Sequence, residues 1–284
     1  MKLNHDRQMR KSIAIIITSI LVLSGCNKQQ SVSDRLLNEV GKAIAINPDS
    51  ASNLLKSISS PEKLDDKAFA RWCMLSGKIT DEIFNSILPT YQLERAYDWY
   101  SSHGSPDEQV QILIYLGRSY FADGDYDKAM SIYTNALDIA GKNKLNNLIG
   151  YTYDYIGDLY REKFMRTEAI KRYEIAAEYF KKEKNTDSYA CALRDIGREY
   201  AQMDSLSHAL NILIIADSVA ANTSNINVTA SINNALGNIY SMQNKYDKAE
   251  EYLLKALLTG REKMPDYVAL IDLYTASNSI NKAK

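Results

Sequence analysis

Four glycines recur at a spacing of 40 residues, and this period constrains the fold more than any other feature of the sequence. They are Gly117, Gly157, Gly197 and Gly237. A tyrosine stands three residues after each glycine, at Tyr120, Tyr160, Tyr200 and Tyr240. Alanines stand twelve and nineteen residues after each glycine, at Ala129, Ala169, Ala209 and Ala249 and at Ala136, Ala176, Ala216 and Ala256. This shared register predicts four copies of one structural unit.

The residue types in the repeat predict pairs of closely packed helices. A glycine inside a helix costs about 1 kcal/mol relative to alanine, so a repeated one indicates that a neighbouring helix approaches too closely for a side chain. The two alanines, seven residues apart, place small side chains on one face of a second helix. We expect the tyrosine one turn after each glycine to fill the space that the small residues leave. Each unit is therefore an antiparallel helix pair.

Few residues interrupt these helices. Only 12 glycines and 5 prolines occur in 284 residues, and short connections such as Gly124-Asp125 and Lys163-Phe164 separate the two helices of a unit. The composition is 45% hydrophobic and 24% charged, as in a folded chain. These features predict an all-α fold.

The repeated sequence resembles the tetratricopeptide repeat (TPR). The resemblance rests on the aliphatic-Gly-x-x-Tyr pattern, followed by Asp-Tyr-Asp-Lys-Ala at 125–129 or Lys-Tyr-Asp-Lys-Ala at 245–249, and then by Ala136 or Ala256. The common TPR has 34 residues, and the 40-residue unit here is similar to its long-helix variants. The resemblance implies an α-solenoid, a right-handed superhelix of antiparallel helix pairs.

The period and its boundary signals predict the domain organisation. Four TPR-like repeats span 106–262, and Ser105-Pro106-Asp107-Glu108 marks their start with an N-cap, a proline at the first helical position and a capping glutamate. Residues 33–105 form degenerate helical hairpins, and 263–284 form an incomplete fifth repeat. The end of this repeat is expected to be covered by a partner or by another copy, or to reflect a shortened gene product.

The first 25 residues are typical of a secretory signal peptide. Met9-Arg10-Lys11 precedes an apolar run over 12–23 that is too short to span a bilayer. Leu23-Ser24-Gly25-Cys26 resembles the lipobox of bacterial lipoproteins, which implies cleavage before Cys26 and a diacylglycerol on its thiol. Residues 26–32 would form a tether, and the alternatives are a signal peptide without lipid or a membrane anchor. The predicted location is the cell envelope, with the periplasmic face of the outer membrane favoured.

Charge and cysteine content exclude several classes of function. Residues 1–25 hold four of the 34 basic and one of the 35 acidic residues, so the remainder has a net charge near −4. This balance argues against nucleic-acid binding through phosphate contacts. Cys73 and Cys191 are 118 residues apart and have no metal-ligand spacing. A buried thiol at each position is favoured over a disulfide between them.

The resemblance places the first helix of each repeat on a concave groove, and the exposed positions around each glycine are its candidate ligand residues. Three residues before the glycines stand Asp154, Arg194 and Asn234, and one residue after them stand Arg118, Asp158, Arg198 and Asn238. Glu162 lies one turn beyond Asp158, and Tyr115, Tyr151 and Tyr155 are candidate groove aromatics. Residues 40 apart should be neighbours, so Arg118 should face Asp158, Asp158 should face Arg198, and Asp154 should face Arg194.

Two interpretations of these charges remain open. They could neutralise one another in a ladder between repeats, or they could bind an extended peptide or a helix, with the arginines taking carboxylates and the acidic residues taking basic groups. A metal site at Asp154, Asp158 and Glu162 is disfavoured because one helix offers too few ligands and arginines stand beside it. No catalytic motif, cofactor-binding loop or site for a small-molecule substrate is evident, so no cofactor is expected.

The sequence therefore predicts a lipid-anchored, non-catalytic scaffold that binds a protein or peptide. The N-terminal half also resembles exported TPR proteins of Gram-negative bacteria, many of which continue into a transmembrane helix and a DNA-binding domain. The alternative function is thus the sensory, peptide-binding half of a truncated regulator. A third alternative is an enzyme with a site hidden in residues 33–105.

Overall fold

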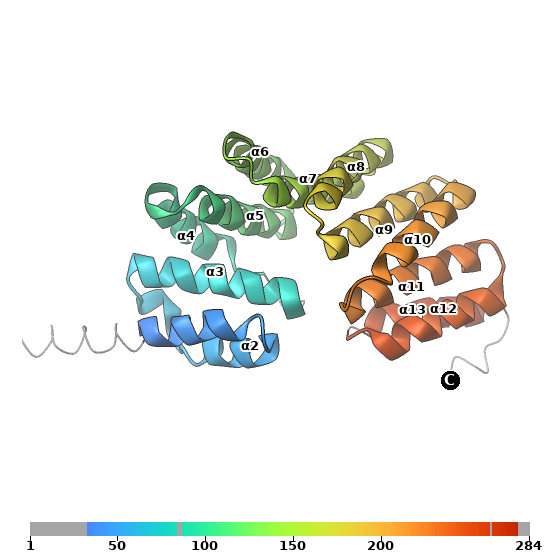
Figure 1. Cartoon of the computed structure of the whole chain (residues 1–284), viewed down its shortest axis with the longest axis horizontal. Helices are drawn as coiled ribbons and strands as arrows, with labels where there is room; N and C mark the ends of the chain where they lie inside the picture. Colours follow the sequence, from blue (N-terminus) through green and yellow to red (C-terminus); the bar gives the residue numbers. More distant parts are fainter. Residues whose placement is uncertain (1–32, 84–86, 262, 278–284) are drawn as a thin grey trace, which may run out of the picture. The chain divides into compact units, whose positions relative to one another are not determined.

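The computed structural model describes residues 33–83, 87–261 and 263–277, and all regular structure within these ranges is helical (Figure 1). The all-α prediction is therefore confirmed. The predicted signal peptide, Cys26 and the tether lie outside the described residues. None of the helices within the described ranges is long and apolar enough to cross a bilayer.

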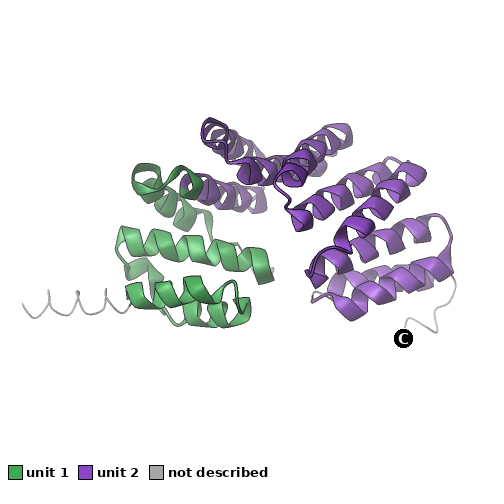
Figure 2. Cartoon of the chain, viewed as in Figure 1, with its two compact units in different colours: residues 1–108 green, residues 109–284 purple. Residues whose placement is uncertain are grey.

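The chain divides into two compact units at Glu108 and Gln109, a few residues after the predicted start of the first repeat (Figure 2). Unit 1 contains a helical segment at 33–43, followed by four elements. These are α2 (Pro48–Lys56), the 3-10 turn η1 (Pro61–Lys63), α3 (Asp66–Ile83) and α4 (Thr90–His103). Helix α3 packs against both α2 and α4, and the core contains Leu37, Val40 and Ile79.

Two helix caps are present in this region, and the one at Ser105 was predicted. Asn47 accepts a hydrogen bond from the backbone N–H of Ser50 at 2.9 Å and begins α2. Glu108 accepts from the backbone N–H of Ser105 at 2.9 Å, and the Ser105 hydroxyl accepts from the N–H of Glu108 at 3.3 Å. This reciprocal pair is a capping box, which fixes where α5 begins.

Unit 2 contains the helix pairs that the period predicts. The first helices are α5 (Pro106–Ala122), α7 (Asn146–Glu162), α9 (Thr186–Gln202) and α11 (Ile226–Met242). The second helices are α6 (Tyr126–Lys142), α8 (Arg166–Lys182), α10 (Leu206–Ala220) and α12 (Tyr246–Thr259). A last helix, α13 (Met264–Ala276), packs against α11 and α12. From α6 onward each helix contacts the next, and α9 also contacts α11, so the pairs stack in sequence order.

The glycines make close helix approach possible, but the side chain that fills each space is not the one expected. A Cβ built on Gly157 would lie 2.5 Å from Cε1 of Tyr173, a residue of the second helix, and Gly117 has the same relation to Tyr133. In the last two repeats Leu213 and Leu253 take this position against Gly197 and Gly237. The tyrosine three residues after the glycine does not fill the space at the glycine itself, but it packs against the core that contains the repeated alanines, as Tyr240 does in the cluster with Ala249. The residue sixteen positions later reaches the glycine from the facing helix.

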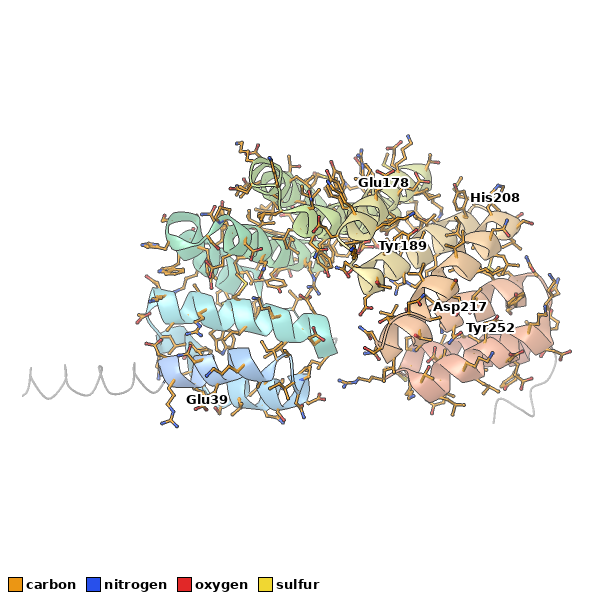
Figure 3. All side chains as sticks on the ribbon, in the orientation of Figure 1. Glu39, Glu178, Tyr189, His208, Asp217 and Tyr252 are labelled. Atoms are coloured by element: carbon orange, nitrogen blue, oxygen red, sulfur yellow. The ribbon has the colours of Figure 1, made fainter. Side chains whose placement is uncertain are left out.

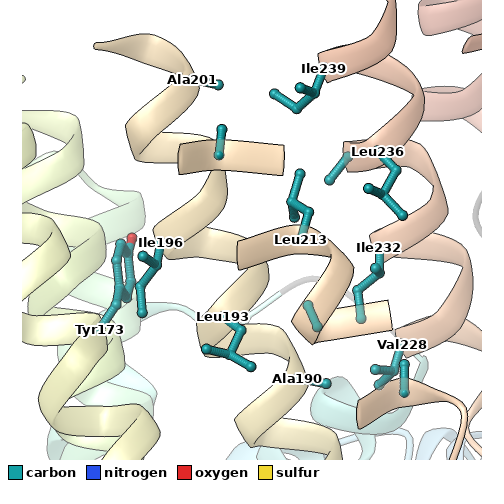
Figure 4. Close-up of a cluster of buried hydrophobic side chains, with 14 of the residues drawn as sticks. Tyr173, Ala190, Leu193, Ile196, Ala201, Leu213, Val228, Ile232, Leu236 and Ile239 are labelled. Atoms are coloured by element: carbon teal, nitrogen blue, oxygen red, sulfur yellow. The ribbon is translucent and has the colours of Figure 1, made fainter. Parts of the chain in front are cut away.

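The eight repeated alanines confirm the predicted close packing. All of them have zero exposure. They lie on the face of the second helix that also carries Tyr173 or Leu213. Ala169, Ala209 and Ala216 belong, with residues such as Ile196, Ile232 and Leu236, to the core cluster of the later repeats (Figure 4). Small residues on one helix and large residues on the other therefore interlock through the stack.

A common turn joins most of the helices. One residue in each of six connections has a positive φ: Gly124, Lys144, Phe164, Lys184, Asp204 and Asn244. The residue after it donates its N–H to the carbonyl five positions earlier, as Met165 does to Tyr160 at 2.9 Å. This pattern is the Schellman motif, which satisfies helix-end carbonyls and reverses the chain within a few residues.

Replacing Gly157 by alanine should destabilise the folded chain by about 1–3 kcal/mol, because the new methyl group would overlap the Tyr173 ring. Chemical denaturation followed by circular dichroism measures the change. Gly141→Ala is the matched control, since a Cβ there meets nothing within 4 Å and alanine is the better helix former. Equal destabilisation by both substitutions would contradict the interlock.

Candidate functional site

Four of the predicted site residues come together between α7, α8 and α9. They join three residues that the sequence analysis did not single out. We call the set the α7–α9 charge cluster, and its members are Asp154, Asp158, Arg161, Tyr173, Arg194, Asp195 and Arg198.

Arg194 and Asp195 form the most buried ion pair of the cluster. The Arg194 Nε and Nη2 atoms donate to the two Asp195 carboxylate oxygens at 3.0 and 2.7 Å, and Nη1 donates to the Ser231 hydroxyl at 2.9 Å. Asp195 is only 5% exposed. Burial opposes its ionisation, but the charge and hydrogen bonds of Arg194 outweigh burial and hold the pKa of Asp195 below its usual value. This bidentate pair fixes Arg194 in place.

A second group links α7 to α8. The Tyr173 hydroxyl donates to Asp158 Oδ1 at 2.7 Å, and Arg161 approaches the same oxygen at 2.9 Å. Arg161 also donates to the Tyr173 hydroxyl at 3.2 Å. Burial raises the pKa of Asp158 despite Arg161, and burial next to Asp158 raises the pKa of Tyr173. The Tyr173 ring, which packs against Gly157, thus also places its hydroxyl in the cluster.

Asp154 is the unsatisfied member of the cluster. Its Oδ1 is buried and has no hydrogen-bond partner among the described residues. Burial raises the pKa of this carboxyl well above its usual value, and the neighbouring carboxylates of Asp158 and Asp195 raise it further. A neutral carboxylic acid at this position can donate one proton and accept one hydrogen bond.

Arg198 is the accessible cation of the cluster. Its Nη1 lies 3.5 Å from Asp195 Oδ1, an oxygen that Arg194 already binds, and its side chain keeps 41% exposure. Partial burial and the adjacent charge of Arg194 lower the pKa of Arg198 to about 10. The guanidinium is therefore charged at neutral pH, and it shares its counterion, Asp195, with Arg194.

The residues predicted to face one another across repeats make their direct contacts with other groups. Arg194 binds Asp195 of its own helix, and Asp158 binds Arg161 of its own helix and Tyr173 of α8. Asp154 and Arg194 still act on each other electrostatically, as expected of neighbours. The cause is Asp195, which stands two residues before the glycine, where the other repeats have Tyr115, Tyr155 and Ala235. A carboxylate one residue from Arg194 competes successfully with the more distant Asp154.

Glu199 is a second buried carboxylate that the sequence analysis missed. It is 1% exposed and accepts a hydrogen bond from Nη1 of Arg166, the first residue of α8, at 2.8 Å. The other repeats have Ser119, Leu159 and Ile239 at this register position, all buried. A charged residue at a position that is uncharged in every other repeat was the available signal, both here and at Asp195.

The remaining predicted residues lie outside the cluster. The Arg118 guanidinium lies over the rings of Tyr115 and Tyr155 at 5.9 and 5.1 Å, and the Tyr151 hydroxyl accepts from Asn185 and Ser188 at 3.1 and 2.9 Å. Glu162 is exposed.

Asn234 and Asn238, which were predicted to line the groove, contribute to the packing of α13. Asn234 donates to Asp266 at 2.7 Å in a buried contact, and Asn238 donates to Asn234 at 3.0 Å. Asn234 therefore connects α11 to α13.

His208, Cys73 and Cys191 are not members of the charge cluster. His208, labelled in Figure 3, stacks on Tyr200 with 5.7 Å between ring centroids. Within the described ranges, no group of three or more histidines, cysteines or acidic residues has an arrangement that could hold a metal ion. Cys73 and Cys191 are both free thiols, and burial raises the pKa of Cys73 to about 12.

Comparisons with known proteins agree with this architecture. Residues 113–146 and 229–264 each match a family model described as tetratricopeptide repeat. Photosystem I assembly protein Ycf3 of Rippkaea orientalis is 32% identical over 91 residues, which are 31% of this chain and 52% of Ycf3. The chain thus matches about half the length of that relative.

Solved structures show the same fold. The Rap protein complexed with competence and sporulation factor aligns with a TM-score of 0.75 at 18% identity, covering 90% of this chain and 74% of that chain. The apo form of the quorum sensor NprR from B. thuringiensis aligns with a TM-score of 0.57 at 14% identity, covering 90% and 73%. The described part of the chain is therefore all-helical and of the α-solenoid class. Two of its segments match the tetratricopeptide repeat.

Asp154→Asn should stabilise the chain at neutral pH by at least about 1 kcal/mol, because the amide is neutral without taking up a proton, whereas each unit by which burial raises the carboxyl pKa costs about 1.4 kcal/mol at neutral pH. The folded pKa of Asp154 is raised above 3.8, so the folded chain binds a proton that the unfolded chain has released. Stability therefore falls as pH rises from about 4 to the folded pKa, and the variant should lack this loss. Denaturation at several pH values measures the difference.

Asp127→Asn provides the matched control, because its side chain is 96% exposed and its contact with Lys163 lies at the surface. Its stability should stay within about 0.5 kcal/mol of the parent chain. If the stability of Asp154→Asn changes with pH as that of the parent does, Asp154 is not the buried neutral acid.

Proposed function

We propose that this chain is an exported, lipid-anchored scaffold that binds a protein or peptide through the first-helix face of its repeats and performs no catalysis. The observation that carries the proposal is Arg198, a partly exposed cation whose carboxylate partner, Asp195 Oδ1 at 3.5 Å, is also bound by Arg194. Desolvated guanidinium groups form strong, bidentate hydrogen bonds with carboxylates, which proteins and peptides supply.

Both interpretations of the charges contribute to this proposal: most charges of the cluster neutralise one another, and one is available to a partner. Arg194–Asp195 is an internal pair within α9 and Arg161–Asp158 one within α7, whereas Arg166–Glu199 joins α8 to α9. The Tyr173 hydroxyl, bonded to Asp158, joins α8 to α7. Such pairs hold the side chains of the cluster in place, and their charges neutralise one another, so these groups are not available to a ligand. Arg198 is the group that we assign to a partner. TPR proteins are generally non-catalytic scaffolds, and the Rap neighbour is described as complexed with a factor, which agrees with a binding role.

Arg198→Gln should remove most of the partner recovered by affinity purification from detergent-solubilised membranes, at least a tenfold loss if one charge-assisted hydrogen-bond pair is removed. Lys171→Gln is the matched control, because Lys171 is exposed on α8 and its ion pair with Glu168 is remote from the cluster. Quantitative mass spectrometry of the bound proteins measures the loss. Equal recovery with both variants would refute a role for Arg198.

The anchor is proposed from the sequence around Cys26. Cys26→Ser should abolish incorporation of labelled palmitate and move the chain from the membrane to the soluble fraction after export, because the thiol is the site of lipid attachment in the resembling proteins. Metabolic labelling and fractionation measure both effects. A soluble but still labelled variant would place the lipid elsewhere, and an unlabelled parent chain would remove the lipoprotein proposal.

A second candidate is the sensory half of a signalling protein. The fold resembles the quorum sensor NprR and, with a TM-score of 0.57, a STAND protein with a tetratricopeptide repeat sensor from Pyrococcus horikoshii, of which this chain covers 38%. In this case the same face would bind a peptide and transmit a conformational change. The coding sequence that follows Lys284 distinguishes the candidates, since a regulator requires an output domain.

A further inference from the structure

The α7–α9 charge cluster is electrically balanced when all its charged side chains are ionised. Its cations are Arg161, Arg194 and Arg198, and its carboxylates are Asp154, Asp158 and Asp195. A carboxylate of a partner bound to Arg198 would therefore add one negative charge in excess. An uncompensated charge is costly where solvent is largely excluded, so this excess weakens binding unless the cluster loses a negative charge at the same time.

Asp154 is the carboxyl of the cluster that gains least from being ionised. Asp195 is held by both donors of Arg194, and Asp158 accepts from the Tyr173 hydroxyl. The buried Oδ1 of Asp154, in contrast, has no hydrogen-bond partner within the described part of the chain. A proton on Asp154 thus removes one negative charge from the cluster and leaves the pairs of the other two aspartates intact.

The groups around Asp154 leave it as the main acceptor of this proton. Those that act on it electrostatically are Asp158 and Arg161 on its own helix, Tyr133 on α6, and Cys191, Arg194 and Asp195 on α9. Burial raises the pKa values of Tyr133 and Cys191, so both stay neutral at neutral pH. Burial also raises the pKa of Asp158, but the charge of Arg161 and the hydrogen bond from Tyr173 oppose this rise.

Arg198 and Asp154 are connected through Asp195. The Arg198 guanidinium lies 3.5 Å from Asp195 Oδ1, and the charge of Asp195 raises the pKa of Asp154. A second carboxylate at Arg198 would act on Asp154 in the same direction. By linkage, a proton on Asp154 must then strengthen the binding of that carboxylate by the same factor.

We propose that the site binds a carboxylate of the partner on Arg198 together with one proton on Asp154, so that partner affinity decreases as pH rises. The inference rests on the proposed function, because it takes Arg198 as the group that meets the partner. It adds the chemical class of the recognised group and a dependence on pH. Below the pKa of Asp154 the proton is already bound and affinity is full. Above it the proton must be taken up on binding, and affinity falls by at most about tenfold per pH unit.

Fluorescence anisotropy of a rhodamine-labelled hexaglutamate peptide, titrated with the detergent-solubilised full chain, tests the proposal. The measurement runs from about pH 6 to about pH 9 at constant ionic strength, where the peptide carboxylates stay ionised. The affinity of the parent chain should fall at least about threefold over this range. Asp154→Asn should keep the affinity that the parent has at the lowest pH, because the amide is neutral throughout.

Two further variants serve as controls. Asp127→Asn should retain the pH dependence of the parent, since the Asp127 side chain is 96% exposed. Arg198→Gln should bind the peptide at least about tenfold more weakly at every pH, because the charge-assisted contact is lost. His103 and His208 are present in every variant, so their titration affects all of them equally.

The outcomes separate this inference from the proposed function. Binding that requires Arg198 but does not weaken with pH would overturn the proton coupling and leave the binding role of Arg198 standing. An Asp154→Asn variant with the pH dependence of the parent would do the same. If the parent chain binds no hexaglutamate at any pH, recognition of a carboxylate is overturned, and recovery of the membrane partner with Arg198→Gln then decides the proposed function separately.

Discussion

The interlock between a glycine on one helix and a ring or leucine on the next is the contact on which the repeat array depends. It allows the two helices of each pair to approach more closely than ordinary side chains permit, and the repeated alanines extend this close approach along the pair. Because the same contact recurs every 40 residues, it also fixes the helix register in all four repeats. Polar residues can then occupy reproducible positions on the first helices.

The charge cluster is built on that register. Tyr173 fills the notch at Gly157 and its hydroxyl binds Asp158, so one side chain serves both packing and polar chemistry. Around it, arginines and carboxylates from α7 and α9 lie together, where removing one partner of a buried pair costs several times more than at the surface. Most of these charges satisfy one another. Asp154 has one buried carboxylate oxygen without a hydrogen-bond partner among the described residues, and Arg198 is partly exposed and shares Asp195 with Arg194. These two residues distinguish the region from a purely structural ladder.

The two ends of the repeat array are stabilised by contacts that differ from the glycine contact of its middle. At the N-terminal side, the capping box between Ser105 and Glu108 begins the repeats by satisfying helix-end donors locally. On the C-terminal side, α13 packs its inner face on α11 and α12, with Asn234 bonded to Asp266, and leaves an apolar outer face.

The sequence alone determined the helix pairs, their period, the turns and the small-residue positions, because these depend on local spacing that every copy repeats. It also located the first helices on which the candidate residues lie. Tertiary structure decided which side chain fills each glycine notch, since that contact joins residues sixteen positions apart on facing helices. It also decided the charge pairs. Asp195 and Glu199 break the pattern of the other repeats, and only burial between three helices shows that their carboxylates compete for Arg194 and Arg166. A repeated pattern specifies geometry, whereas the strength of a buried ion pair depends on the distances and solvent exclusion that arise when the repeats stack.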